Sequence, residues 1–326
     1  MKCFCLPYNG DTEFILGYCR RNADFIHEVY GAEGTFATGR LTHHVDEQEL
    51  ISLISMLKKL DIKFNYLLNS ISIKSYITQQ ERLLKHLNSL KEVGLSELTV
   101  SHPHMVKVLS EMGFKVSTSL VQNVRTIEDK NWAEFFGYSR IICSDDLNRR
   151  FSELKNLITN SHLPIEIIVN NMCLPSCPLR HSHYELEAYG GECGWNTELK
   201  KAKKQVVLCR SLWRNNPEAF LKSSWIRPED IGRYLDIGVK YIKIAGRDRC
   251  SESLRKTFDY YISGECTGSV FDYLLPGVDP LNKYGLPYID NKKLGEFFNH
   301  VLSLSGGCPA DCDNCIYCKT FINKII

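Results

Sequence analysis

Short runs of β-branched and aromatic residues alternate with longer segments of helical spacing over the first three-quarters of the chain. This alternation limits the possible folds more than any other feature, because repeated strand, helix and strand favour a parallel sheet. The segment 46–60 shows the helical pattern well, since Leu50, Ile54 and Leu57 fall on one face. The expected strands are 2–8, 63–69, 97–102, 115–120, 139–144, 165–170 and 240–246.

Such a sheet either closes into a barrel or stays open and doubly wound. No glycine-rich phosphate fingerprint follows the first expected strand, which weakens the open, dinucleotide-binding alternative. We therefore expect an α/β fold with a TIM-barrel-like core over residues 1–263, whose functional residues lie at the carboxyl ends of the strands. The alternation loosens from about Gly264, so residues 264–326 are expected to form a cysteine-rich C-terminal appendage.

Composition narrows the class of protein further. The 326 residues are 44% hydrophobic with a net charge of +2, which is typical of a globular protein and gives no strong case for nucleic-acid binding. No segment has the run of about 18 apolar residues that a membrane span needs, and the start lacks the apolar core of a signal peptide. We expect a cytoplasmic protein, in which the 14 cysteines are mostly reduced unless they bind metal or cycle catalytically.

Four cysteines near the C-terminus have the spacing C-x3-C-x2-C-x2-C, at Cys308, Cys312, Cys315 and Cys318. Four thiolates so close in sequence can surround one metal centre. Zinc takes four thiolates in a tetrahedron, and a [4Fe–4S] cluster also takes four. The spacing favours an iron–sulfur cluster, leaves zinc open, and makes four unrelated thiols the least favoured alternative.

A second group of cysteines begins directly after the apolar run "IEIIVN". Cys173 and Cys177 would lie at the carboxyl end of that strand, and Cys193 follows in the glycine-flanked segment "GGECGWN". Cys209, in "QVVLCRSLW", is a candidate fourth ligand but equally fits a helical core. We expect a shared metal centre, with a redox-active Cys173–Cys177 pair or ordinary buried cysteines as the alternatives.

Polar residues follow most of the expected strands, and a barrel would direct them towards one pocket. Lys243 and Arg247 are candidate catalytic residues that could bind an anionic group of a substrate. His181 and His183 are candidates for proton transfer, although a solvated loop would also accommodate them. The candidate substrate-binding residues are Asn170, Asn171, Thr118, Ser119 and His102.

Three blocks, "KVSTSLVQNVRTIEDKNWAEFFGYSRIICSDDLN", "IEIIVNNMCLPSC" and "RPEDIGRYLDIGVKYIKIAGRDR", occur in this order between Glu97 and Arg249. Together they resemble the collagenase-like peptidase U32 family. The resemblance implies a TIM-barrel-like core with a [4Fe–4S] cluster at its mouth. The ligands that it implies are Cys173, Cys177 and Cys193, with Cys209 as the fourth.

The family includes proteins described as peptidases and others that take part in oxygen-independent hydroxylation of ubiquinone precursors or RNA bases. Three features depart from its pattern: the spacing from Cys173 to Cys177 is shorter than in the common members, Ala245 stands where an acidic residue is frequent, and the C-terminal quartet suggests a second metal centre. We expect an iron–sulfur redox enzyme that modifies a small molecule, an RNA or a peptide, with an electron donor or a homologous subunit as its partner. A U32-type peptidase and a non-catalytic, zinc-stabilised binding or assembly protein are the alternatives.

Overall fold

The computed structural model describes residues 2–33, 36, 38–39, 45–193, 196–206, 209–305, 307–309, 311–312 and 314–326. In this part of the chain, eight parallel strands form one sheet in the order β5-β4-β3-β2-β1-β8-β7-β6. The strands are β1 (Phe4–Pro7), β2 (Ile26–Gly31), β3 (Lys63–Leu68), β4 (Glu97–Val100), β5 (Lys115–Ser117), β6 (Ile141–Ile142), β7 (Ile165–Ile168) and β8 (Tyr241–Lys243).

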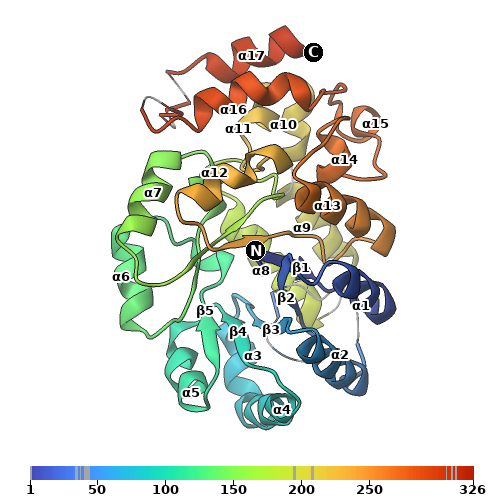
Figure 1. Ribbon diagram of the computed structural model, residues 1–326, viewed down its shortest axis with the longest axis vertical. Coiled ribbons are helices and arrows are strands. Elements are labelled where there is room, and N and C mark those ends of the chain that lie inside the picture. Colours follow the sequence, from blue (N-terminus) through green and yellow to red (C-terminus); the bar gives the residue numbers. More distant parts are fainter. Residues whose placement is uncertain are drawn as a thin grey trace.

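The two edge strands of this sheet, β5 and β6, curl round to meet each other. They are joined by single parallel bridges, Ser117 to Arg140 and Val124 to Cys143, and by a 3.0 Å hydrogen bond from the Thr118 N–H to the Arg140 carbonyl. The sheet is therefore a nearly closed barrel ringed by helices, which confirms the expected TIM-barrel-like fold (Figure 1).

The strand β2 is absent from the strands that the sequence predicts. Its sequence, "IHEVYG", carries a histidine and a glutamate in the middle of the run, which hides the apolar pattern of a strand. Glu28 nevertheless points into the barrel and is fully buried. A buried charge is tolerated when a partner neutralises it, and the partner of Glu28 is Arg140, which directly precedes β6 on the far side of the barrel.

Helices connect the strands on the outside of the barrel. Asp46, for example, caps the helix α2 by accepting a 2.8 Å hydrogen bond from the Gln48 N–H, and Leu50, Leu53 and Leu57 of this helix are buried. The outer helices are α1 (Thr12–Arg21), α2 (Glu47–Lys59), α3 (Ile73–Thr78), α4 (Gln80–Glu92), α5 (Val106–Glu111), α6 (Ile127–Phe135), α7 (Phe151–Thr159), α12 (Ile231–Asp236) and α13 (Ser251–Ser263).

The connection between β7 and β8 is much longer than the others and carries the central cysteines. A loop with Cys173 and Cys177 leads into α8, where Tyr184 and Glu187 lie over the mouth of the barrel. The additional helices of this connection are α8 (Arg180–Cys193), α9 (Thr197–Val206), α10 (Cys209–Asn215) and α11 (Glu218–Lys222).

The residues after α13 pack on one side of the barrel and share its hydrophobic core. The rings of Phe297 and Phe321 lie 5.3 Å apart, and Tyr317 stacks on Phe297 at 5.9 Å. Figure 1 shows α16 and α17 together at one end of the molecule, where α17 also contacts α11. The helices of this segment are α14 (Phe271–Leu274), α15 (Pro280–Tyr284), α16 (Gly295–Val301) and α17 (Tyr317–Ile325).

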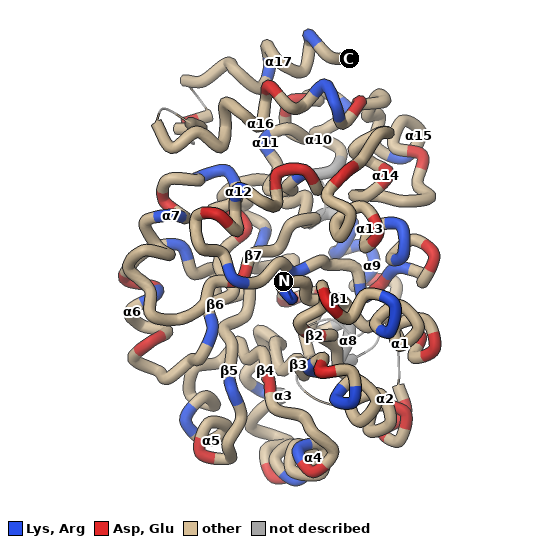
Figure 2. The backbone as a smooth tube through the Cα atoms, in the orientation of Figure 1, with Lys and Arg blue, Asp and Glu red and all other residues tan. Residues whose placement is uncertain are grey.

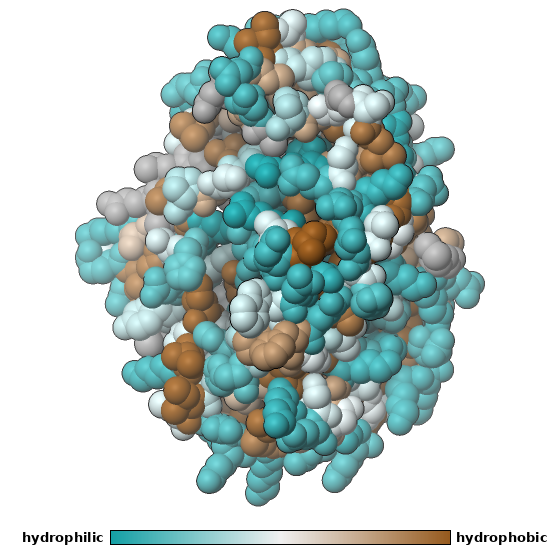
Figure 3. Space-filling model, turned by 90° about the vertical axis from the view of Figure 1, so that its left-hand side faces the viewer, coloured by the Kyte–Doolittle hydropathy of each residue, from teal (hydrophilic) through white to brown (hydrophobic). Residues whose placement is uncertain are grey.

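Charged residues of both signs are interspersed over the outer helices (Figure 2). Hydrophilic residues cover most of the face in Figure 3, and the apolar residues on it occur in small groups. Among the described helices, we find none with the length and apolar character that crossing a membrane requires.

Candidate functional site

A cavity of about 170 Å³ opens at the carboxyl ends of the barrel strands. Residues at the ends of six strands line it, and Tyr184 and Glu187 of α8 cover it. Because the carboxyl ends of parallel strands form the functional rim of such barrels, this cavity is the candidate active site. The polar side chains that line it are Tyr30, Asn69, Thr99, Ser119, Tyr184, Glu187, Lys243 and Arg247.

Beneath the cavity, the barrel interior holds a network of buried charges. Arg140 bridges three carboxylates, with nitrogen–oxygen distances of 2.9 Å to Glu28, 3.2 Å to Glu97 and 2.8 Å to Glu166. Lys243 lies 3.0 Å from the other oxygen of Glu166, and its Nζ is 4.1 Å from the ring centre of Tyr30. The network therefore reaches from the middle of the barrel to a cation that lines the cavity.

Two of the three glutamates that contact Arg140, Glu28 and Glu166, differ in acidity, because Glu166 also contacts Lys243. Burial raises the pKa of Glu28, and Arg140 offsets this rise only in part. Burial also acts to raise the pKa of Glu166, but Lys243 and Arg140 together hold that pKa below its ordinary value. Glu166 is thus a firmly ionised carboxylate that keeps the ammonium group of Lys243 at the floor of the cavity.

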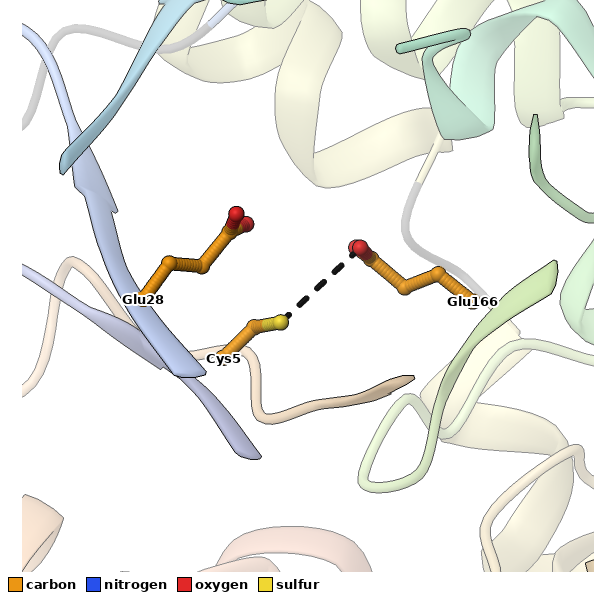
Figure 4. A group of neighbouring side chains, drawn as sticks. All are labelled: Cys5, Glu28 and Glu166. Carbon is orange, nitrogen blue, oxygen red and sulfur yellow. Dashed lines mark hydrogen bonds between the residues drawn. The ribbon is translucent and has the colours of Figure 1, made fainter. Parts of the chain in front are cut away.

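Cys5, Glu28 and Glu166 point towards one another from β1, β2 and β7 (Figure 4). Among the described residues this is the one group whose three potential metal-ligand atoms lie within 4.8 Å of one another. Arg140 and Lys243 already neutralise the two carboxylates, so a metal ion here would add charge to a balanced cluster. Burial, reinforced by the two glutamates, raises the pKa of Cys5 well above its ordinary value, so its thiol stays protonated.

The cavity brings together three of the residues that the sequence singles out, namely Lys243, Arg247 and Ser119. Two others serve the fold. Thr118 accepts a 2.8 Å hydrogen bond from the Ile142 N–H where the barrel closes. Asn170 exchanges two hydrogen bonds with the backbone of Ala245, at 2.8 and 2.7 Å, and so ties the end of β7 to the end of β8.

The histidines among the candidates lie outside the cavity lining. His102 contacts the Ile71 carbonyl through Nε2 at 3.1 Å and packs edge-on against Tyr76. His183 lies 3.4 Å from Glu187 on the same helix, and His181 lines a neighbouring polar pocket of about 420 Å³. His181 and His183 thus lie on α8 and His102 follows β4, and none of the three lines the cavity.

The loop after β7 is held by a compact set of polar contacts. Asn171 donates a 2.6 Å hydrogen bond to Asp145, and Arg180 pairs with Asp145 at 2.9 Å and with Asp146 at 2.8 Å. Ser176 adopts a left-handed conformation, with φ of 49°, and its N–H donates to both oxygens of Asp146 at 3.2 Å. These contacts define the path of the backbone between the two central cysteines.

Cys173 and Cys177 are partly exposed on this loop, and Cys177 lines the polar pocket together with His181 and Arg180. Arg180 pairs with both aspartates, and its Nε is buried with no hydrogen-bond partner among the described residues. Two partly exposed thiols on one loop, near a guanidinium with one unused N–H donor, have the donor chemistry of an iron–sulfur site. The side chains of the other two candidates, Cys193 and Cys209, lie outside the described residues.

The C-terminal cysteines lie on the segment between α16 and α17 and at the start of α17. Cys308 and Cys318 pack partly buried against the main core, while Cys312 is exposed. Burial raises the pKa of Cys318 to about 12, and the nearby Cys308 adds to this rise. The positive charges of Arg149 and Lys222 oppose it. No three of the four sulfurs of this quartet come within 4.8 Å of one another.

The charged residues of the barrel interior, among them Glu28, Arg140 and Glu166, are absent from the candidate residues that the sequence indicates. A signal for them exists in the sequence. Each lies in or next to an apolar strand, as in "IEII" and "SRIIC". Strands of a parallel sheet are buried on both faces, so a single charge within such an apolar run indicates a buried charge. Which residues pair, however, follows only from the barrel's closure.

A parallel barrel with a polar, cation-lined cavity at the carboxyl ends of its strands defines an enzyme-like (β/α) protein. Comparison with known families identifies which one: the sequence model of Peptidase family U32 matches residues 19–263. The chain therefore belongs to Peptidase family U32. This confirms the resemblance stated from the sequence.

Two relatives agree with this assignment. An uncharacterized protease of Methanocaldococcus jannaschii is 25% identical over 309 residues, which cover 92% of this chain and 88% of the relative. A solved structure of a U32 peptidase superposes with a TM-score of 0.52 at 15% identity, covering 76% of this chain and 93% of that one. The second likeness shows the barrel fold.

Proposed function

We propose that this U32 protein is an iron–sulfur enzyme that modifies an anionic substrate bound at the mouth of its barrel. The observation that carries the proposal is the cavity itself, whose lining includes Lys243 and Arg247 from the end of β8. Tyr184 of α8 lines this cavity and also the neighbouring polar pocket, which contains Cys177 of the cysteine loop. Family resemblance suggests oxygen-independent hydroxylation, or a related modification of a small molecule, an RNA base or a peptide, as the reaction.

Cys173, Cys177, Cys193 and Cys209 would hold a [4Fe–4S] cluster beside the cavity, and the cluster would supply electron transfer. The other roles belong to residues that the structure describes. Glu166 holds the side chain of Lys243 at 3.0 Å, so this ammonium group and the Arg247 guanidinium can bind a carboxylate or phosphate of the substrate. Tyr184 and Glu187 on α8 restrict water at the mouth.

Metal analysis tests the proposal directly. Anaerobically purified protein should absorb near 400 nm, and Cys173→Ser or Cys177→Ser should each remove about four iron atoms per chain, the content of one cubane cluster. Cys250→Ser is a matched control, because Cys250 is an exposed cysteine at the start of α13 that belongs to neither group of candidate ligands, and its loss should leave the iron content unchanged. Iron-free protein, or an iron content that Cys173→Ser and Cys177→Ser leave unchanged, would refute the proposal.

The names of the two relatives favour peptide hydrolysis as a second candidate. The described residues that line the cavity include no histidine that could act as base to a nucleophile. Cys5 and Cys143 are fully buried, and burial raises the pKa of each thiol, so neither is an activated thiolate. Peptide cleavage that persists after iron chelation would nevertheless establish the peptidase and displace the redox enzyme.

A further inference from the structure

The barrel contains a second buried arginine, and unlike Arg140 it forms no ion pair with any carboxylate in the part of the chain that the structure describes. Arg149 follows the turn after β6 and is 5% exposed. Its guanidinium carbon lies 5.1, 4.7 and 5.9 Å from the ring centres of Trp225, Phe298 and Phe297. Its Nε, Nη1 and Nη2 are all buried without a hydrogen-bond partner among the described residues.

An arginine cannot escape burial by losing its proton, because the guanidinium group is not deprotonated in proteins. Burial lowers the pKa of Arg149, so its positive charge is disfavoured where it lies. The aromatic rings attract this cation yet accept none of its N–H groups in conventional hydrogen bonds. A buried charge in this condition is costly unless an anion lies beside it.

The nearby oxygen groups are already engaged. Asp230 is held by Arg227 through contacts of 2.6 and 3.1 Å, and Arg233 approaches it at 3.5 Å. The Tyr234 hydroxyl donates a 2.6 Å hydrogen bond to a backbone carbonyl. The C-terminal cysteines lie next to the same rings: Cys318 follows Tyr317, which stacks on Phe297 at 5.9 Å, and the Cys308 N–H donates a 3.3 Å hydrogen bond to the Val301 carbonyl of α16.

We propose that Cys308, Cys312, Cys315 and Cys318 hold a four-thiolate metal centre, and that Arg149 of the barrel is its buried counter-charge. Four thiolates around Zn²⁺ carry a net charge of minus two, and so do four thiolates around an oxidised [4Fe–4S] core. Either centre gives the orphaned N–H groups of Arg149 sulfur acceptors on an anion. The proposal stands independently of the barrel-mouth cluster, because it concerns different cysteines.

This pairing links the C-terminal segment to the barrel. Cys308 and Cys318 pack against the core that contains Trp225, Phe297 and Phe298, the rings around Arg149, and α11, which carries Lys222, contacts α17. A bound metal would draw the quartet together over Arg149, since no three of its four sulfurs lie within 4.8 Å of one another, whereas the sulfurs of a tetrahedral zinc site with 2.3 Å bonds lie roughly 3.8 Å apart. The α16–α17 segment would then be fixed to the barrel electrostatically.

Removal of the arginine charge should have opposite effects on the two forms of the protein. In the metal-free chain, Arg149→Met removes an uncompensated buried charge and should raise the urea midpoint of unfolding. In the metal-loaded chain the same change removes the partner of an anionic centre and should weaken metal binding about 10- to 100-fold. A purely structural arginine would not give this reversal of sign.

The full-length chain carrying Cys173→Ser and Cys177→Ser serves as the background, so that metal at the barrel mouth does not contribute. In it, we compare Zn²⁺ affinity and urea midpoints for Arg149→Met, Arg149→Lys and the neighbouring control Arg150→Met, whose arginine pairs with Glu153 at the surface at 3.4 Å. Arg149→Lys keeps the charge and should weaken binding less than Arg149→Met. Iron, sulfide and zinc contents after anaerobic purification decide which metal the native centre holds.

Three results would overturn the proposal. The first is a Cys308→Ser, Cys318→Ser variant that binds metal as tightly as its parent. The second is an Arg149→Met affinity equal to that of the Arg150→Met control. The third is a metal-free Arg149→Met chain that is less stable than its parent or does not fold, because that result would show that the protein itself already compensates Arg149.

Discussion

Replacement of Arg140 by methionine is expected to lower the free energy of unfolding by about 3–5 kcal/mol, or to prevent folding altogether. The guanidinium contacts three fully or almost fully buried carboxylates, of Glu28, Glu97 and Glu166. Methionine fills a similar volume but leaves these carboxylates to Lys63 and Lys243 alone. Urea denaturation followed by circular dichroism measures the loss.

Arg255→Met provides the control, because Arg255 pairs with Asp259 on the outer surface at 3.1 Å and both side chains are half exposed. We expect that change to cost about 0.5 kcal/mol or less. Adding Glu28→Gln to Arg140→Met should restore at least about 1 kcal/mol, since it removes one of the uncompensated charges. A loss below about 1 kcal/mol for Arg140→Met would contradict the account of the barrel interior as one charge network.

The stability of the protein should fall in mild acid because of His27. This ring stacks on Tyr241 at 4.2 Å, and its Nε2 is buried without a hydrogen-bond partner among the described residues. Burial, together with the positive charges of Arg140 and Lys63, lowers the pKa of His27 from 6.5 to about 3. Below pH 6.5 the unfolded chain therefore binds a proton that the folded chain does not.

The unfolding free energy consequently decreases as the pH falls from about 6.5 towards 3, and this single group accounts for a loss of about 2 kcal/mol between pH 7.5 and 5. His27→Gln should abolish that part of the pH dependence. The exposed His162 offers a matched control, since His162→Gln should leave the slope as it is in the parent. Equal slopes for parent and His27→Gln in urea melts at the two pH values would show that His27 is protonated in the folded state.

The charge network also bears on the proposed function. Glu166 joins Arg140 in the interior to Lys243 in the cavity, so the position of Lys243 depends on residues that a substrate never reaches. Variants of Glu166 are therefore expected to affect substrate binding through Lys243 as well as stability, and the two effects should be measured separately.

The barrel and its family could be predicted from the sequence because both rest on local patterns. Alternating strands and helices appear as residue periodicity, and the block "IEIIVNNMCLPSC" places two cysteines directly after a strand. The seven predicted strands correspond to β1 and β3–β8. The missing strand, β2, contains Glu28, a charge that is explained only by its partner on another strand.

The sequence by itself determined the order of strands and helices, the spacing of the cysteines and the family to which the chain belongs. Only the tertiary structure decided which charges meet, because Arg140 reaches glutamates on β2, β4 and β7 once the sheet has closed. Likewise, only the packing of the C-terminal helices brings Cys308 and Cys318 to the core that contains Trp225, Phe297 and Phe298, the rings around Arg149. Periodicity reports which face of an element is buried, whereas ion pairs between distant segments depend on the register and closure of the whole barrel.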